Sequence, residues 1–212
     1  MVFVRWHGHS CFELKSSKTI LIDPHDGSSL GLQTPVSEPD VILVTHSHDD
    51  HAGGRHLFTK FGSLMVNKPC RINLDGINII GIKTFHDDVQ GARLGENVVY
   101  VVEAEGVKFC HLGDIGHVLT PQHLNDVTDI DVLFVSIGRN ILLAEENIER
   151  IKPKVVIPMH YYVEGIIFPY FPLLKVEGFL KGKDKGIYLN ESVAEYNKEK
   201  LPLEREIHVF KI

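Results

Sequence analysis

The sequence contains few cysteines, and their spacing fits neither a disulfide framework nor a zinc knuckle. Cys11, Cys70 and Cys110 lie far apart and form no Cys-x-x-Cys pair. Disulfides and a thiolate zinc site are therefore not indicated. Reduced thiols are typical of a cytoplasmic protein, which is the localisation we expect.

A long apolar segment is also missing. The first residues, MVFVRWHGHS, contain no apolar core of a signal peptide. No apolar run approaches the about 18–20 residues that a membrane-spanning helix needs. We therefore expect no membrane partner.

Positive charge is in deficit and is not clustered. The chain has 22 Lys and Arg against 28 Asp and Glu, and its formal net charge is −6. Proteins that bind a phosphate backbone normally carry a basic patch, so nucleic acid is not an expected partner. Flexible linkers, charge blocks and short repeats are lacking too, so residues 1–212 are expected to form a single domain.

Short strand patterns dominate the first half of the chain. They are apolar or alternating runs separated by turn residues, namely VFVRW, CFELK, TILID, VILVT, LMVN, INIIGIKTF, NVVYVVEAEG and VKFCHLG. The last two are joined at Glu105-Gly106, which predicts a tight hairpin. Such hairpins indicate mixed or antiparallel sheets.

Helical patterns appear in the second half, each followed by an apolar strand. In TPQHLNDV, Thr120 is an N-cap and Pro121 stands at the first helical position, and AEENIERI has helical periodicity. FPLLKVEGFLKG is a further helix candidate, and IYLN and REIHVFKI are read as terminal strands. The pattern predicts sheets covered by helices, an α/β (α+β) fold.

Several of the predicted strands end in His or Asp, and 13 histidines is an unusual number. The strand-end residues are Asp23, His46, His86, His111, Asp114 and His160. A strand end holds a side chain rigidly at the rim of a sheet. These side chains would converge if the strands shared one sheet edge.

The densest group lies in VILVTHSHDDHAGG, residues 41–54. Imidazole and carboxylate ligands without Cys suit Zn²⁺, and also Mn²⁺ or Fe²⁺. His46 and His48, two residues apart, can chelate one ion from an extended loop. Asp50 and His51 diverge from them and can reach a second ion. The spacing therefore predicts a metal centre with room for two ions.

The segment THSHDDHAGG resembles the HxHxDH motif of the metallo-β-lactamase superfamily. Four further positions, in the expected order, are similar to its other motifs: Asp23, His86, Asp114 and His160. GHSCFE, FHDDVQGARLGEN, HLGDIGH and PKVVIPMHY look like the compact hydrolase branch that includes the L-ascorbate-6-phosphate lactonase-like proteins. The resemblance covers residues 1 to about 165 and implies a four-layer αββα sandwich with the site at one edge of its sheets.

The resemblance also implies a division of the ligands. One metal would be held by His46, His48 and His86, another by Asp50, His51 and His160, and Asp114 would bridge them. Asp23 would not bind a metal itself but would orient one of the metal-binding side chains. Zn²⁺, two ions per chain, is the implied cofactor.

Five further residues are candidates for orienting the ligands or contacting the substrate: His9, His111, Arg139, Tyr161 and Asp23. His111 rivals His86 as a ligand, because it precedes Asp114 by only three residues. Arg139 could clamp an anionic substrate. Tyr161 could donate to a developing oxyanion, or could simply pack in the core.

We therefore expect a hydrolase in which a metal-activated hydroxide attacks a small ester, lactone or phosphoester, with Asp50 or Asp114 handling the proton. Two other functions stay open, a mononuclear iron oxidative enzyme of the same fold and a non-catalytic metal sensor. The expected partner is a small-molecule substrate. The apolar segment YYVEGIIFPYFPLL suits a pocket wall or a subunit interface, so a homo-oligomer also stays open.

Overall fold

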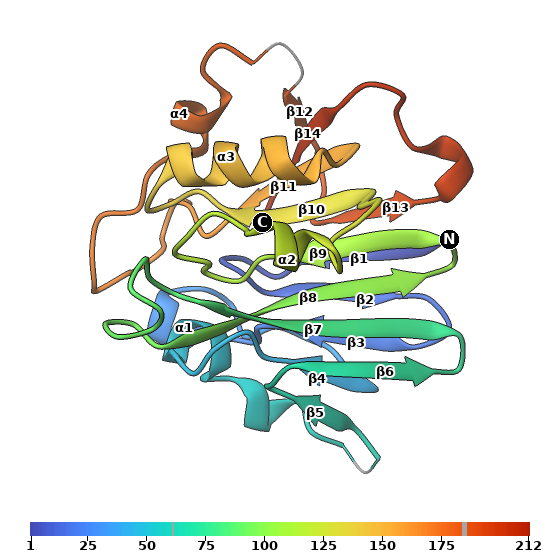
Figure 1. Cartoon of the computed structure of the whole chain (residues 1–212). Coiled ribbons are helices and arrows are strands. Elements are labelled where there is room, and N and C mark those ends of the chain that lie inside the picture. The colour runs from blue at the N-terminus through green and yellow to red at the C-terminus, as the bar shows by residue number, and fades with distance from the viewer. Residues whose placement is uncertain (61, 184–185) are drawn as a thin grey trace.

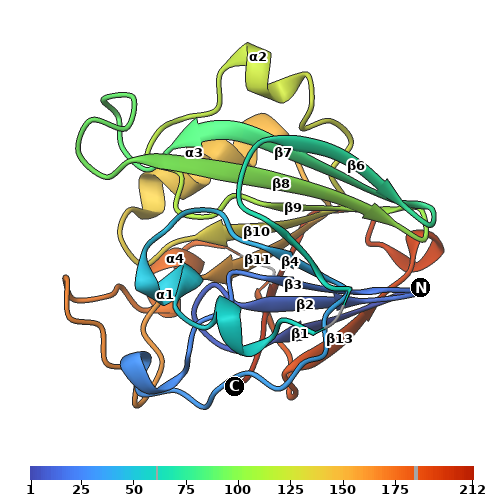
Figure 2. The same ribbon diagram turned by 90° about the horizontal axis from the view of Figure 1, so that it is seen from below.

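The strands form two sheets in the computed structural model, which describes residues 1–60, 62–183 and 186–212. Figure 2 shows the sheets as two layers, with α2 and α3 on the side of the eight-stranded sheet that faces away from the six-stranded one. The predicted α/β sandwich is confirmed, but strands predominate and the helices are few and mostly short.

The six-stranded sheet has the order β13-β1-β2-β3-β4-β5. Its strands are β13 (Val193–Tyr196), β1 (Val2–Trp6), β2 (Phe12–Lys15), β3 (Thr19–Ile22), β4 (Val41–Leu43) and β5 (Leu64–Val66). β3 and β4 are parallel, with Ile22 opposite Leu43. Parallel strands end at the same sheet edge, so Asp23 and the histidines that follow β4 emerge together.

The eight-stranded sheet has the order β12-β14-β11-β10-β9-β8-β7-β6. Its strands are β12 (Gly186–Tyr188), β14 (Glu206–Val209), β11 (Val155–Met159), β10 (Val132–Ser136), β9 (Val107–His111), β8 (Glu96–Ala104), β7 (Ile77–Phe85) and β6 (Cys70–Leu74). β9, β10 and β11 are mutually parallel, and β7 runs in the same direction because both β7 and β9 are antiparallel to β8. The residues that follow these four strands therefore lie at one edge.

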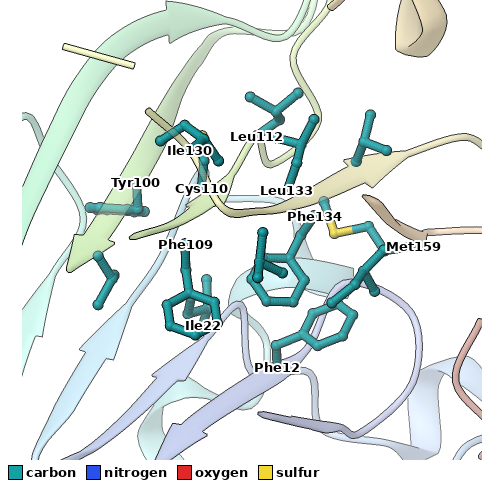
Figure 3. Close-up of a cluster of buried hydrophobic side chains, with 14 of the residues drawn as sticks. Phe12, Ile22, Tyr100, Phe109, Cys110, Leu112, Ile130, Leu133, Phe134 and Met159 are labelled. Atoms are coloured by element: carbon teal, nitrogen blue, oxygen red, sulfur yellow. The ribbon is translucent and has the colours of Figure 1, made fainter. Parts of the chain in front are cut away.

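Large side chains from both sheets fill the space between them (Figure 3). Phe12 of β2 and Phe134 of β10 are fully buried, and their ring centroids lie 4.4 Å apart. Tyr100 of β8 donates its hydroxyl toward the carbonyls of Val44 and Val66, each at 3.1 Å. The apolar side chain and the satisfied hydroxyl of Tyr100 together tie the two sheets to each other.

The helices are α1 (Asp49–Ala52), α2 (Pro121–Leu124), α3 (Ile141–Ile151) and α4 (Val176–Leu180), and 3₁₀ turns occupy Ser28–Leu30, Arg55–Leu57 and Lys198–Lys200. Thr120 caps α2 in a capping box, and Asn140 caps α3 by accepting from Leu143 N at 3.1 Å. α3 packs against β10, and α1 lies at the left-hand end of the sheets in Figure 1. No helix within the described residues has the length and apolar content needed to cross a membrane.

Most predicted elements are confirmed, including the β8–β9 hairpin, in which Glu105 and Gly106 both have positive φ. Two strands lacked a clear pattern and were not predicted, β6 and β13. Residues of β6 alternate between half-buried and exposed, and β13 is buried at Tyr196 only. The FPLLKVEGFLKG helix is limited to the five residues of α4.

Replacement of Asp131 by Asn is expected to lower the free energy of unfolding by about 1–3 kcal/mol at pH 7. The Asp131 side chain is 2% exposed, lies 3.2 Å from Lys154 Nζ and accepts hydrogen bonds from Lys198 Nζ at 2.6 Å and Lys108 N at 3.0 Å. Burial raises the pKa of Asp131, but Lys198 and the Lys108 amide outweigh burial and hold it below its usual value.

Because the folded-state pKa of Asp131 is lowered, its stabilisation is complete above the ordinary Asp pKa of about 3.9 and is lost as the pH falls through the folded value. The difference in unfolding free energy between wild type and Asp131→Asn, measured in urea, should therefore shrink on acidification. A difference independent of pH would show that the carboxylate charge is not the cause.

Candidate metal centre

The strand ends of both sheets bring eight His and Asp residues together. They form three overlapping groups whose potential ligand atoms lie within 4.8 Å of one another: His9, Asp50, His51 and His160; His46, His48 and His86; and His46, His51 and Asp114. Apart from His48 and Asp114, which are partly exposed, all of these residues are buried. The convergence expected from the strand-end pattern is therefore present.

Asp114 lies between the first two groups. Its Oδ2 atom is 3.0 Å from His160 Nε2, 3.5 Å from His51 Nε2 and 3.6 Å from His86 Nε2. One carboxylate thus approaches histidines of both groups.

A chain of hydrogen bonds behind the cluster fixes two of its imidazoles. His51 Nδ1 lies 2.7 Å from Asp23 Oδ2, which also accepts from Thr45 Oγ1 at 2.7 Å, and Thr45 Oγ1 lies 2.9 Å from His46 Nδ1. Because the hydroxyl hydrogen goes to Asp23, Thr45 can only accept from His46. Both histidines are then protonated on Nδ1 and present Nε2 to the cluster.

Three site residues other than glycine have left-handed backbones: His9, Asp23 and His160, with φ of 53°, 48° and 54°. This conformation is uncommon for such residues and is maintained by the surrounding structure. The His9 carbonyl accepts from Trp6 Nε1 at 3.0 Å and from His160 N at 3.1 Å. The two strained residues His9 and His160 therefore support each other.

The carboxylates of the cluster hold protons on neighbouring histidines. Burial lowers the pKa of His160, but Asp114 and Asp50 outweigh burial and raise it to about 9. Burial raises the pKa of Asp114, yet His160 and His51 hold it well below its usual range. A divalent cation would replace these protons, because imidazole binds metal only when neutral.

The donor set fits a metal. Several buried nitrogen and oxygen atoms of the cluster have no hydrogen-bond partner among the described residues: His46 Nε2, His51 Nε2, His160 Nε2 and Asp114 Oδ1. Leaving such atoms unpaired away from water is costly. Imidazole nitrogen and carboxylate oxygen are the ligands that Zn²⁺ and its first-row neighbours take, so the orphaned atoms match a cation site.

Comparison with known proteins identifies the family of the chain. A family model described as a β-lactamase superfamily domain matches residues 3–160, which is most of the chain. The chain belongs to the metallo-β-lactamase superfamily. The resemblance seen in the HxHxDH motif is thereby confirmed.

Relatives within the superfamily carry hydrolase names. A UPF0173 metal-dependent hydrolase from Thermococcus onnurineus is 32% identical, over 76% of this chain and 85% of the relative. Another, from Thermoplasma volcanium, is 28% identical over 78% and 86%. The crystal structure of a Thermotoga maritima protein, described as a Zn-dependent hydrolase of the superfamily, aligns with a TM-score of 0.76, 33% identity and coverage of 99% and 98%. The chain is a metal-dependent hydrolase of the metallo-β-lactamase superfamily.

His86 and His111 were rival candidates for the same metal-ligand position, and the geometry favours His86. His86 lies with His46 and His48 in one potential ligand group. Both ring nitrogens of His111 are engaged, Nε2 near the Ser10 carbonyl at 3.0 Å and Nδ1 as acceptor from Gly113 N at 3.1 Å. His111 thus holds the turn that leads to Asp114.

His9, in the loop that follows β1, lies within the cluster of potential ligands. Its Nε2 lies 2.9 Å from Asp50 Oδ2, its ring centroid is 3.9 Å from that of His160, and it is fully buried. Phe168 packs against both rings. The segment around Phe168 therefore flanks the centre.

Tyr161 and Arg139 are placed very differently. Tyr161 is 3% exposed and packs on Trp6, with ring centroids 5.4 Å apart, so its ring belongs to the core. Arg139 is exposed and lines a cavity that also contains His86 and Asp114.

Two positioning residues, Asn97 and Asp87, were not predicted from the sequence. Asn97 is fully buried and its Oδ1 accepts from Asp114 N at 3.1 Å. Asp87 accepts backbone hydrogen bonds from residues 89, 91, 93 and 94 and so shapes the loop after His86. A buried amide within the apolar run ENVVYVV was the only signal for Asn97.

Proposed function

We propose that the protein is a dinuclear metal hydrolase that acts on a small ester, lactone or phosphoester. The observation that carries the proposal is the position of Asp114 Oδ2, within 3.6 Å of His86 Nε2 on one side and within 3.5 Å of His51 and His160 Nε2 on the other. His46, His48 and His86 would hold one ion, and Asp50, His51 and His160 the other.

Zn²⁺ is the first candidate ion. A ligand set of five histidines and two aspartates without Cys fits it, and Mn²⁺ and Fe²⁺ accept the same ligands. Asp23 and Thr45 would support Zn²⁺ binding, because their contacts with Nδ1 of His51 and His46 leave Nε2 of both histidines as the ligand atom. His9 would orient Asp50 through the contact between His9 Nε2 and Asp50 Oδ2.

Divalent cations bound here would acidify water and polarise the oxygen of the scissile bond. The chain's own residues then have two tasks, to hold the ligand atoms in place and to accept a proton. Asp114 Oδ1 is buried and has no hydrogen-bond partner among the described residues, so it is placed to accept the proton that water loses. Asp50, already paired with His9, is the second candidate for proton transfer.

No protein nucleophile is needed for this reaction. Cys11 and Cys110 are fully buried, and burial raises the pKa of both thiols. A thiol kept protonated in the core is a poor nucleophile. We therefore propose water as the nucleophile, activated at the cluster of carboxylates and imidazoles.

The purified protein is expected to contain about two metal ions per chain by elemental mass spectrometry, because each of the two proposed ligand groups offers at least three donor side chains. It should hydrolyse at least one class of a panel of esters, lactones and phosphodiesters, and dialysis against a chelator should abolish turnover until Zn²⁺ or Mn²⁺ is restored. One ion per chain would refute the dinuclear centre. Full metal content without turnover across the panel would favour a sensor, and iron with oxygen consumption an oxidative enzyme.

A further inference from the structure

A cavity of about 380 Å³ opens directly beside the metal centre. Its lining includes His86 and Asp114 and also Arg93, Arg139 and Asn140. Its volume lies near the lower end of the about 300–1,000 Å³ typical of small-molecule sites. A small molecule that fills the cavity therefore touches the metal-binding residues and the arginines at the same time.

Arg139 is fixed relative to the metal centre by its neighbour Gly138. A Cβ atom on Gly138 would lie 1.8 Å from the His160 carbonyl oxygen, so only glycine allows the end of β10 to approach the end of β11 this closely. Gly138 O also accepts from Leu174 N at 2.9 Å. The backbone beneath Arg139 is therefore anchored to a proposed metal ligand, although its side chain is exposed.

Arg139 is also the cation of this cavity that has no carboxylate partner among the described residues. Its guanidinium carbon lies 5.8 Å from the ring centroid of Phe171, a contact that leaves the hydrogen-bond donors free. Arg93, by contrast, lies 3.8 Å from Asp88. A planar guanidinium with free donors is suited to bidentate binding of an oxyanion.

The acidic residues of the cavity do not compete for Arg139. Asp87 is occupied by its four backbone amides, Asp88 lies beside Arg93, and Asp114 approaches the histidines. The start of α3 adds to the same wall, because Asn140 and Leu143 line the cavity and the first turn of the helix contains no acidic residue. The part of the lining formed by Arg139 and the start of α3 therefore carries a cation and no carboxylate.

We propose that the cavity binds a substrate that carries an anionic group, a carboxylate or a phosphate, in addition to the bond that is cleaved, and that Arg139 is the residue that selects for it. The anion would sit on Arg139, and the scissile bond would lie on the side of His86 and Asp114. This inference rests on the proposed function, since it assigns the substrate class of the same site.

Three para-nitrophenyl esters with the same leaving group test the proposal: the neutral butyrate, the hemiglutarate with a free carboxylate, and the phosphonobutyrate. In Arg139→Ala, kcat/KM for the two anionic esters should fall about tenfold, since one charge-assisted hydrogen-bond pair is lost, and kcat/KM for the neutral ester should stay within about twofold. Arg139→Lys should recover part of the loss for the anionic esters. An arginine with a merely structural role would reduce all three rates alike, and that result would overturn the proposal.

The matched control is Arg71→Ala, which removes the same charge from the surface. Arg71 lies on β6, is paired with Asp126 and does not line the cavity. It should leave the rates for all three esters unchanged. If Arg71→Ala reduced the rates for the anionic esters as much as Arg139→Ala does, long-range attraction would replace a specific subsite as the explanation.

Binding measured without turnover separates this proposal from the hydrolase function. Calorimetric titration of the metal-loaded protein with glutarate and with methylphosphonate should give a Kd about tenfold weaker in Arg139→Ala than in wild type or Arg71→Ala. Weaker binding of only one of the two ligands would identify carboxylate or phosphate as the anion. Such weakening in a protein that cleaves none of the esters would support the subsite and count against ester hydrolysis, whereas cleavage of all three esters with unchanged anion binding would refute the subsite alone.

Discussion

Asp114→Asn is expected to lower kcat/KM by about 10³-fold or more. The amide keeps the size of the side chain but carries no negative charge, so it would hold cations only weakly and could not accept a proton. Loss of metal-based charge stabilisation is worth several kcal/mol, and each 1.36 kcal/mol corresponds to tenfold in rate. Steady-state kinetics on the best substrate of the panel, combined with metal analysis, measures the effect.

Asp49→Asn is the matched control for that experiment. Asp49 stands beside Asp50 in the same motif, but it is exposed at the start of α1 and belongs to no potential ligand group. Its substitution should change kcat/KM by less than about twofold, as for a surface residue. Wild-type activity in Asp114→Asn, or an equal loss in Asp49→Asn, would contradict the bridging role of Asp114.

Asp23→Asn is expected to weaken metal binding by about 10–100-fold, although Asp23 need not touch the metal. The Asp23 carboxylate accepts from Thr45 N, Thr45 Oγ1 and His51 Nδ1, each at 2.7 Å. An amide has one acceptor oxygen for these three donors and directs its own N–H groups at one or more of them. His51 would then turn or change tautomer, and its Nε2 would no longer face the ions.

Competition with a chromogenic chelator measures this affinity, and Asp40→Asn is the control. Asp40 accepts from Thr19 N at 2.8 Å at the first residue of β3, whereas Asp23 follows the last residue of the same strand. Both substitutions remove a carboxylate that accepts a backbone amide, but only Asp23 reaches a histidine of the cluster. Unchanged metal affinity in Asp23→Asn would show that His51 does not depend on this partner.

Much of the fold was predictable because most strands correspond to apolar runs in the sequence that are separated by turn residues. The run VIL of β4 is buried at all three positions, as expected for a strand covered on both faces. β6 and β13 were not predictable, because their burial comes from pairing with β7 and β1 at a distance and not from a pattern of their own. In β6 and β13 the local pattern was therefore too weak to mark the strand.

The candidate site was predictable to the extent that its residues end strands. His46, His86, Asp114 and His160 all follow apolar runs, and the parallel strands bring them together. His9, a candidate from the sequence, does not end a strand, and its approach to the cluster depends on a left-handed turn that carries the loop after β1 across to His160. The cavity beside Arg139 depends likewise on the approach of Gly138 to His160, which no short stretch of sequence encodes.

The pairing of β1 with β13, in which Val2 lies opposite Tyr196, affects how the chain folds during its synthesis on the ribosome. A ribosome adding about 5–20 residues per second needs about 10–40 s to reach the second strand of this pair after the first. Throughout that interval the outer edge of β1 has no strand to complete it, and open strand edges invite pairing with other chains. Strand pairs so distant in sequence also fold slowly, in milliseconds to seconds. The newly made chain therefore depends on its last strands to close the edge that its first strand leaves open.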